Sequence, residues 1–153
     1  MGYARTFAAG IAAGLLLAGQ PAAAETELDK AQKLRELDIM LMVTSLRCRF
    51  GADDFRADYR AFSSRHLNTM NAAARQLTSA LSTRHGARGA TRALDRLSTR
   101  MANAYGGGHP RLGCGELKQV TRRLAQQQSS TLATAASELL ADGPRESVFA
   151  MAR

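Results

Sequence analysis

The chain has 153 residues, and 21 Lys and Arg against 13 Asp and Glu give it a formal net charge of +8 at pH 7. This length provides one domain with an apolar core but is too short for two such domains. Neither C-x-x-C nor H-E-x-x-H is present among so few cysteines and histidines, so we predict no metal centre and no cofactor.

Residues 1–24 have the pattern of a secretory signal peptide. Arg5 precedes an apolar run, Phe7–Gly19, which is too short to span a bilayer, and small residues follow it. These small residues predict cleavage after Ala24, with an uncleaved anchor as the alternative. We therefore expect residues 25–153 to form one periplasmic or secreted helical domain, without a transmembrane segment in the mature chain.

The first predicted helix runs from Glu27 to Phe50. Its apolar residues recur at steps of three and four, and further apolar residues widen the stripe, so that the last two turns look buried nearly all round. Gly51 is expected to end the helix by adopting the left-handed conformation. The apolar positions are Leu28, Leu34, Leu37, Ile39, Met40, Leu41, Met42, Val43, Leu46 and Cys48.

A second helix is predicted to end at His85, with Asp53 or Asp54 as its N-terminal cap. Polar side chains between Ser63 and Asn68 compete for backbone hydrogen bonds, so a bent helix is the alternative to a continuous one. The stripe on this helix consists of Phe55, Tyr59, Phe62, His66, Met70, Ala73, Leu77 and Leu81.

Glycine-rich segments separate the remaining helices. His85–Gly89 is predicted to be a turn, and a shorter helix follows, which Gly106–Pro110 ends. The last helix is expected to begin near Cys114, with a possible break at Ser129–Ser130. Gly143 and Pro144 end it, and the tail 143–153 is expected to fray. The apolar face of the shorter helix carries Leu94, Leu97, Met101 and Tyr105.

These elements predict an all-α, antiparallel four-helix bundle-like domain. In an up-down-up-down bundle, the end of the first helix and the start of the fourth lie at the same end of the molecule. Cys48 closes the first helix and Cys114 opens the fourth. In an oxidising compartment this pair is predicted to form a disulfide that joins the two helices, with a contribution to stability of about 4 kcal/mol.

Arginine recurs every four residues from Arg84 to Arg100. Residues four apart share one helix face, and each guanidinium group can bind a phosphate or carboxylate with two hydrogen bonds. We predict that this face binds an anionic envelope component, namely a lipid, lipopolysaccharide or an acidic protein; a solvated face without a ligand is the alternative. Nucleic acid is not a predicted partner, because no DNA-reading or RNA-reading motif is present. The four predicted anion-binding residues are Arg88, Arg92, Arg96 and Arg100.

No set of residues forms a recognisable catalytic motif, so we predict no catalytic residues. A small enzyme with a site assembled around His66, Asp58 and Tyr59 is the second hypothesis. His66 and Met70 are one turn apart and could be haem ligands, but C-x-x-C-H is absent, and we interpret both as core residues.

The segment from Gly106 to Gly113 is rich in glycine and includes Arg111. Such backbone can surround a phosphate, but this segment matches neither G-x-x-x-x-G-K-[ST] nor G-x-G-x-x-G, and no strand precedes it. We interpret it as a connection between helices.

Three stretches, MLMVTSLRCRFGADDFRADYRAFSSRHLNTMN, LDRLSTRMANAYG and CGELKQVTRRLA, resemble a family of small exported two-cysteine helical proteins of alphaproteobacteria. The resemblance covers most of the mature chain and implies no activity. Some similar sequences are associated with S-adenosyl-L-homocysteine hydrolase. This chain does not support that activity, because it is too short, has an export signal, and lacks the strand-led glycine fingerprint for NAD.

Overall fold

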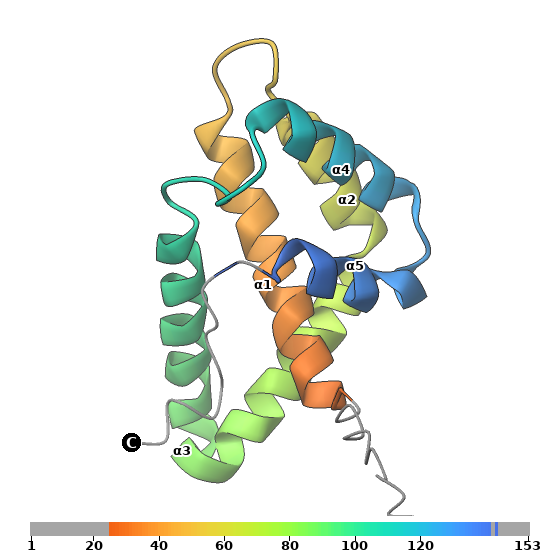
Figure 1. Cartoon of the computed structure of the whole chain (residues 1–153). Coiled ribbons are helices and arrows are strands. Elements are labelled where there is room, and N and C mark those ends of the chain that lie inside the picture. The colour runs from red at the N-terminus through yellow and green to blue at the C-terminus, as the bar shows by residue number, and fades with distance from the viewer. Residues whose placement is uncertain (1–24, 142, 144–153) are drawn as a thin grey trace, which may run out of the picture.

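The computed structural model describes residues 25–141 and 143, and the regular structure in this part of the chain is helical (Figure 1). This confirms the predicted all-α, bundle-like fold. The predicted signal peptide and residues 144–153 of the predicted tail lie outside the described residues. The elements are α1 (Glu27–Arg47), α2 (Arg56–Arg65), α3 (Leu67–Ala104), α4 (Cys114–Gln126), a 3-10 turn η1 (Ser129–Thr131) and α5 (Leu132–Leu139).

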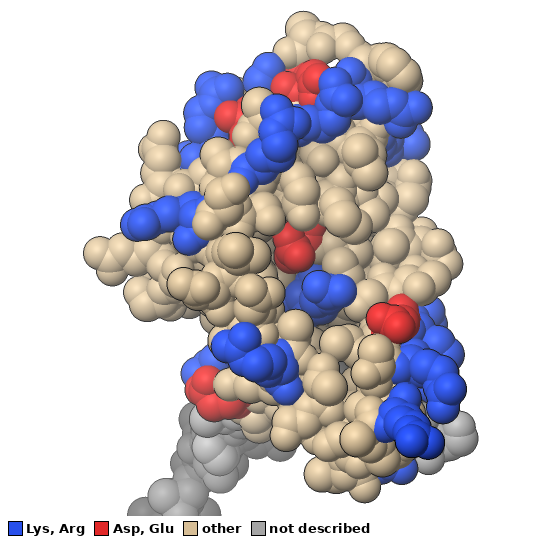
Figure 2. Space-filling view, turned by 180° about the vertical axis from the view of Figure 1, so that it is seen from behind, with Lys and Arg blue, Asp and Glu red and all other residues tan. Residues whose placement is uncertain are grey.

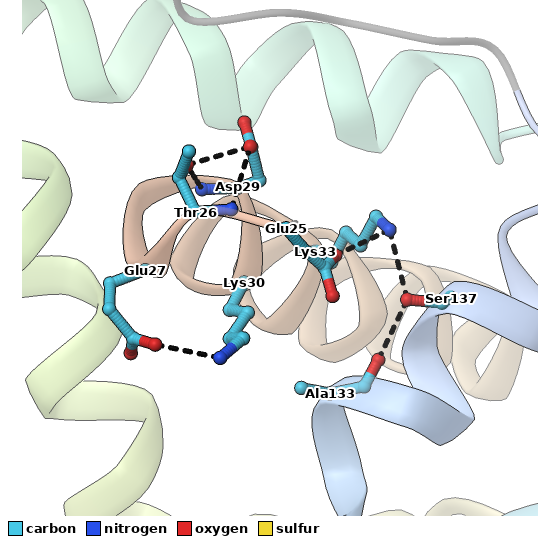
Figure 3. A network of polar contacts seen from close by, with 8 residues as sticks. All are labelled: Glu25, Thr26, Glu27, Asp29, Lys30, Lys33, Ala133 and Ser137. Carbon is cyan, nitrogen blue, oxygen red and sulfur yellow. Dashed lines mark hydrogen bonds and ion pairs between the residues drawn. The ribbon is translucent and has the colours of Figure 1, made fainter. Parts of the chain in front are cut away.

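Helix α1 begins at a capping box. The Thr26 hydroxyl oxygen accepts the backbone N–H of Asp29 at 3.1 Å, and the Asp29 carboxylate accepts the backbone N–H of Thr26 at 3.2 Å (Figure 3). The Thr26 hydroxyl also donates a hydrogen bond to the Asp29 carboxylate, and this bond lowers the pKa of Asp29. These contacts satisfy backbone donors that a helix N-terminus leaves without partners, so α1 starts where the sequence predicted.

Helix α1 lies at the centre of the molecule, because other helices pack against two of its sides. One core cluster joins α1 to α3 and includes Ile39, Leu77 and Leu97. The other joins α1 to α2, α4 and α5 and includes Leu41 and Phe62. This arrangement explains why the apolar stripe of α1 is so broad.

The C-terminal end of α1 differs from the prediction. The helix ends at Arg47 rather than Phe50, and Cys48 is its C-cap; Gly51 has a φ of 112° but lies outside the helix. The last turns are not buried all round, since Met42 is 38% and Leu46 50% exposed. Covering two sides of α1 leaves a third side open to solvent.

The predicted continuous second helix is wrong, because α2 and α3 meet at a bend. His66 has φ −107° and ψ 14°, outside helical values. The hydrogen bonds nevertheless continue, from His66 N–H to Phe62 O and from Met70 N–H to His66 O, both 3.0 Å. The predicted stripe also remains on one side, and Phe62, His66 and Met70 are all buried.

A sharp bend at Gly86 divides α3 into two halves and confirms the predicted turn. Gly86 has φ 66° and ψ 166°, a conformation that residues with a side chain rarely adopt. The first half descends to one end of the molecule and the second half, residues 87–104, returns beside α1 (Figure 1). The bend also brings His85 close to Gly89, where an added Cβ would lie 2.8 Å from the His85 Cβ.

The disulfide lies at the other end of the molecule. It joins Cys48 to Cys114, whose Cα atoms are 5.7 Å apart, and so confirms the predicted link between α1 and α4. The predicted capping by Asp53 or Asp54 is wrong in detail, because Phe55 is the N-cap of α2. The Asp54 carboxylate still accepts the backbone N–H of Arg56 at 3.0 Å.

The last predicted helix is broken at Ser129–Ser130, where the sequence predicted a possible break. After α4, the turn η1 redirects the chain and α5 returns toward α1 (Figure 1). Helix α5 ends at Leu139, before Gly143. Lys33 of α1 donates a hydrogen bond to Ser137 of α5 at 2.9 Å, which ties the last helix to the first (Figure 3).

Candidate functional site

The four predicted anion-binding arginines lie on the second half of α3. The opposite side of this segment packs against α1 through Ala90, Ala93, Leu97 and Met101, all of which are fully buried. This packing turns the arginine side outward. Three of the arginines are exposed and Arg100 is half-buried. We call Arg88, Arg92, Arg96 and Arg100 the arginine face.

The arginine face carries a concentrated positive charge. Arg88, Arg92 and Arg96 make no hydrogen bond or ion pair within the part of the chain that the structure describes. Asp95 is the single acidic residue among residues 87–104. Seen from behind, basic side chains gather along the lower right edge, where this half of α3 lies (Figure 2). The arrangement can take several anionic groups at once.

Two arginines at the other end of the molecule, Arg56 and Arg122, have carboxylate partners. Arg56 forms an ion pair with Asp54 at 2.7 Å, and its side-chain hydrogen bonds lower the pKa of Asp54 to about 2. Arg122 of α4 forms an ion pair with Asp58 of α2 at 3.0 Å. The positive charge there is partly neutralised, whereas Arg88, Arg92 and Arg96 of the arginine face have no such partner among the described residues.

The residues of the enzyme hypothesis do not converge on one another. His66 is 1% exposed and bonds through Nε2 to Leu124 O at 2.9 Å and through Nδ1 to Ser129 Oγ at 3.0 Å. Because a carbonyl oxygen only accepts, Nε2 donates the hydrogen. Both ring nitrogens are therefore occupied, and His66 is not available to hold a haem iron or move a substrate proton.

Asp58 and Tyr59 also have structural partners. Asp58 faces Arg122, whereas the Tyr59 hydroxyl donates to Asp38 Oδ1 at 3.1 Å. Burial raises the pKa of both Tyr59 and Asp38. The three residues thus connect α2 to three different segments, and this geometry gives no support to the enzyme hypothesis.

In the glycine-rich connection, several backbone N–H groups donate hydrogen bonds within the protein. The N–H of Gly108 bonds to Tyr105 O at 2.9 Å, and that of Gly113 to Glu116 Oε2 at 2.9 Å. His109 Nδ1 accepts the N–H groups of Arg111 at 3.2 Å and Leu112 at 3.1 Å. These donors are committed within the protein, so the segment does not present them to a phosphate.

A cleft that sequence analysis did not predict lies between α4, α5 and this connection. It has a volume of about 280 Å³. In the sequence, its lining residues on α4 and on α5 show only the three- and four-residue spacing of one helix face. That spacing does not show that α4 and α5 face each other. The lining residues are His109, Arg111, Leu112, Val120, Arg123, Leu124, Gln127, Ala135, Glu138 and Leu139.

Among the described residues, no group of three or more His, Cys, Asp or Glu side chains could hold a metal ion. No helix of the described chain is both long enough and apolar enough to cross a membrane. Comparisons with protein-family models, curated proteins and solved structures find no match to this chain. The arginine face and the cleft are therefore interpreted from their own residues.

Proposed function

We propose that the protein binds phosphate-bearing amphiphiles of the cell envelope through the arginine face. The shared chemistry is a phosphate group at a membrane surface, which both anionic phospholipid and lipopolysaccharide offer. The observation that carries the proposal is the set of three exposed arginines on one helix face without partners among the described residues.

The spacing of the arginine face suits an extended surface rather than one small ion. Arg88 and Arg100 are twelve residues apart, which is about 18 Å along a helix. Like charges at this spacing repel by a few tenths of a kcal/mol per pair. The face therefore costs some folding stability, and binding of phosphate groups would offset that cost.

The disulfide supports a location in an oxidising compartment outside the cytoplasm, where such surfaces are accessible. There the residues 1–24 would act as an export signal. An arginine near an anionic membrane surface contributes about 1 kcal/mol to binding, so several acting together give a reversible, salt-sensitive attachment.

Sedimentation with vesicles tests the proposal. Mature protein should sediment with vesicles that contain phosphatidylglycerol and with lipopolysaccharide, but not with neutral phosphatidylcholine vesicles, and rising salt should release it. Comparing the first two arms distinguishes the two sources of phosphate. Replacing both Arg92 and Arg96 with Gln should weaken binding by about 2 kcal/mol, roughly thirty-fold.

The matched control is the double variant Arg60→Gln, Arg65→Gln. Both residues are exposed and lie on α2, so this variant loses the same charge at another surface. It should bind almost as well as the parent. Equal losses in the two variants would show that net charge, not the arginine face, governs attachment; no sedimentation of the parent at low salt would leave an acidic protein as the remaining anionic partner.

A further inference from the structure

The cleft between α4 and α5 joins apolar walls to a positive group. On α4, Val120, Arg123 and Leu124 follow helical spacing and so share one face, and Gln127, the C-cap of α4, extends the wall. On α5, Ala135, Glu138 and Leu139 do the same. The two faces meet, and Leu112 closes one side.

Arg123 is the arginine that α4 contributes to this cleft. It is exposed and makes no hydrogen bond or ion pair with the described residues, whereas its neighbour Arg122 is paired with Asp58. Arg111 also lines the cleft, and Glu138 supplies the opposing charge, so the formal balance of these three side chains is positive. An anionic group fits this balance better than a neutral or cationic one.

Two histidines hold the walls in position. His66 donates to Leu124 O near the end of α4, and His109 Nε2 donates to Leu139 O at the end of α5, each at 2.9 Å. Both carbonyls belong to the last turn of a helix, and Leu124 O also accepts the backbone N–H of Gln127 at 3.2 Å. The contact between His109 and Leu112 N–H fixes the third wall. The cleft is thus formed before any ligand enters, as in most small-molecule sites.

The size of the cleft limits the ligand. If a heavy atom occupies about as much liquid volume as a water molecule, ~30 Å³, then the cleft holds on the order of nine such atoms. This is the size of a medium-chain carboxylate, whose chain would lie against Leu124 and Leu139 and whose carboxylate would reach Arg123. A phospholipid with full-length chains is too large.

We propose that this cleft binds a medium-chain carboxylate, with Arg123 as the residue that recognises the carboxylate. The proposal concerns a site on different helices from the arginine face and does not depend on membrane binding. Bidentate pairing with a guanidinium group favours the ionised acid over an alcohol of the same chain length.

Calorimetric titration of the mature protein with octanoate tests the proposal, with octanol as the uncharged probe and palmitate as the long-chain probe. Octanoate should bind in a one-to-one ratio and at least tenfold more tightly than octanol or palmitate. In a two-dimensional NMR spectrum, octanoate should shift the amide signals of Leu124, Gln127 and Leu139.

The variant Arg123→Gln should lose at least tenfold in octanoate affinity, while Arg122→Gln should keep the parental affinity. These substitutions remove the same charge from adjacent residues, and only Arg123 lines the cleft. Ala135→Phe, which fills the cleft, should abolish binding while circular dichroism shows an unchanged helical content. Equal affinities for octanoate and octanol, equal losses in the two arginine variants, or no binding by the folded parent would each overturn the proposal.

Discussion

The two sides of α1 are held by different means. Toward α3, contact is mainly apolar and uses small residues such as Ala73 and Ala93, with a hydrogen bond from Arg35 to Ser98 at 3.2 Å. Toward α2, α4 and α5, the apolar core is supplemented by the disulfide, the buried His66 and an ion pair between Arg122 and Asp58. The side that carries the disulfide and the buried histidine is the side built from short helices.

This difference has a physical reason. A long helix such as α3 satisfies most of its backbone groups internally, whereas a short helix has a larger share of groups at its ends. Helix α5 has eight residues and α2 has ten. Isolated helices of this length are marginal in water, so cross-links and side-chain bonds to their ends stabilise the side that contains them.

Removing the disulfide should produce the largest loss of stability, and this loss should concern mainly one side of α1. The double variant Cys48→Ser, Cys114→Ser is expected to lose about 4 kcal/mol of stability on the chain-entropy model, with little loss of helical circular dichroism. Hydrogen exchange should accelerate more in α4 and α5 than in the second half of α3. Uniform acceleration would argue against two separately supported sides.

Truncating His66 should cost less but still substantially. The variant His66→Ala leaves the buried carbonyl of Leu124 without this donor and opens a cavity, so we expect a loss of about 2 to 4 kcal/mol in urea denaturation. The control is His85→Ala, which removes the same side chain from an exposed position and should change stability by less than about 0.5 kcal/mol. Similar losses for both would contradict the structural role of His66.

The smallest expected effect is the change of stability with pH, which should have opposite signs for two carboxylates, Asp38 and Asp54. Burial raises the pKa of Asp38 in the folded protein, so its contribution to stability is present below the unfolded pKa and is lost as pH rises through the folded pKa. The variant Asp38→Asn should therefore gain stability relative to the parent as pH rises above about 4. Urea denaturation between about pH 3 and pH 7 measures this difference.

Asp54 provides the control with the opposite sign. Its side-chain hydrogen bonds with Arg56 lower its folded pKa to about 2, so its contribution is present above the unfolded pKa and is lost as pH falls through the folded pKa. Asp54→Asn should lose stability relative to the parent as pH rises from about 2 to about 4, which urea denaturation extended down to about pH 2 measures. If the two variants changed with pH in the same direction, the assigned causes of the two shifts would be wrong.

The sequence predicted what depends on local spacing and missed what depends on angles between helices. The stripe from Phe55 to Leu81, the Gly86 bend and the cysteine pair were all readable from residue types and positions. The bend at His66 was not, because the four-residue spacing and the backbone hydrogen bonds both continue through it.

The candidate sites show the same division. The arginine face is a property of one helix, so its exposed side could be predicted from four-residue spacing. The cleft requires α5 to return toward α1 and face α4, and this depends on the contacts of His66 and His109 with carbonyls of two helices. No linear pattern records such contacts, and so Arg123 could not be separated from Arg122 by sequence alone.

The central position of α1 also bears on the order of folding. It is the first helix that the structure describes, yet one of its contacts, from Lys33 to Ser137, spans 104 residues of sequence. Closing such long loops comes before their contacts yield any stabilisation, which slows folding. During synthesis, α1 remains without the last of its neighbours until α5 has been made. The chain is therefore expected to reach its native state only after translation is nearly complete, rather than helix by helix as it emerges.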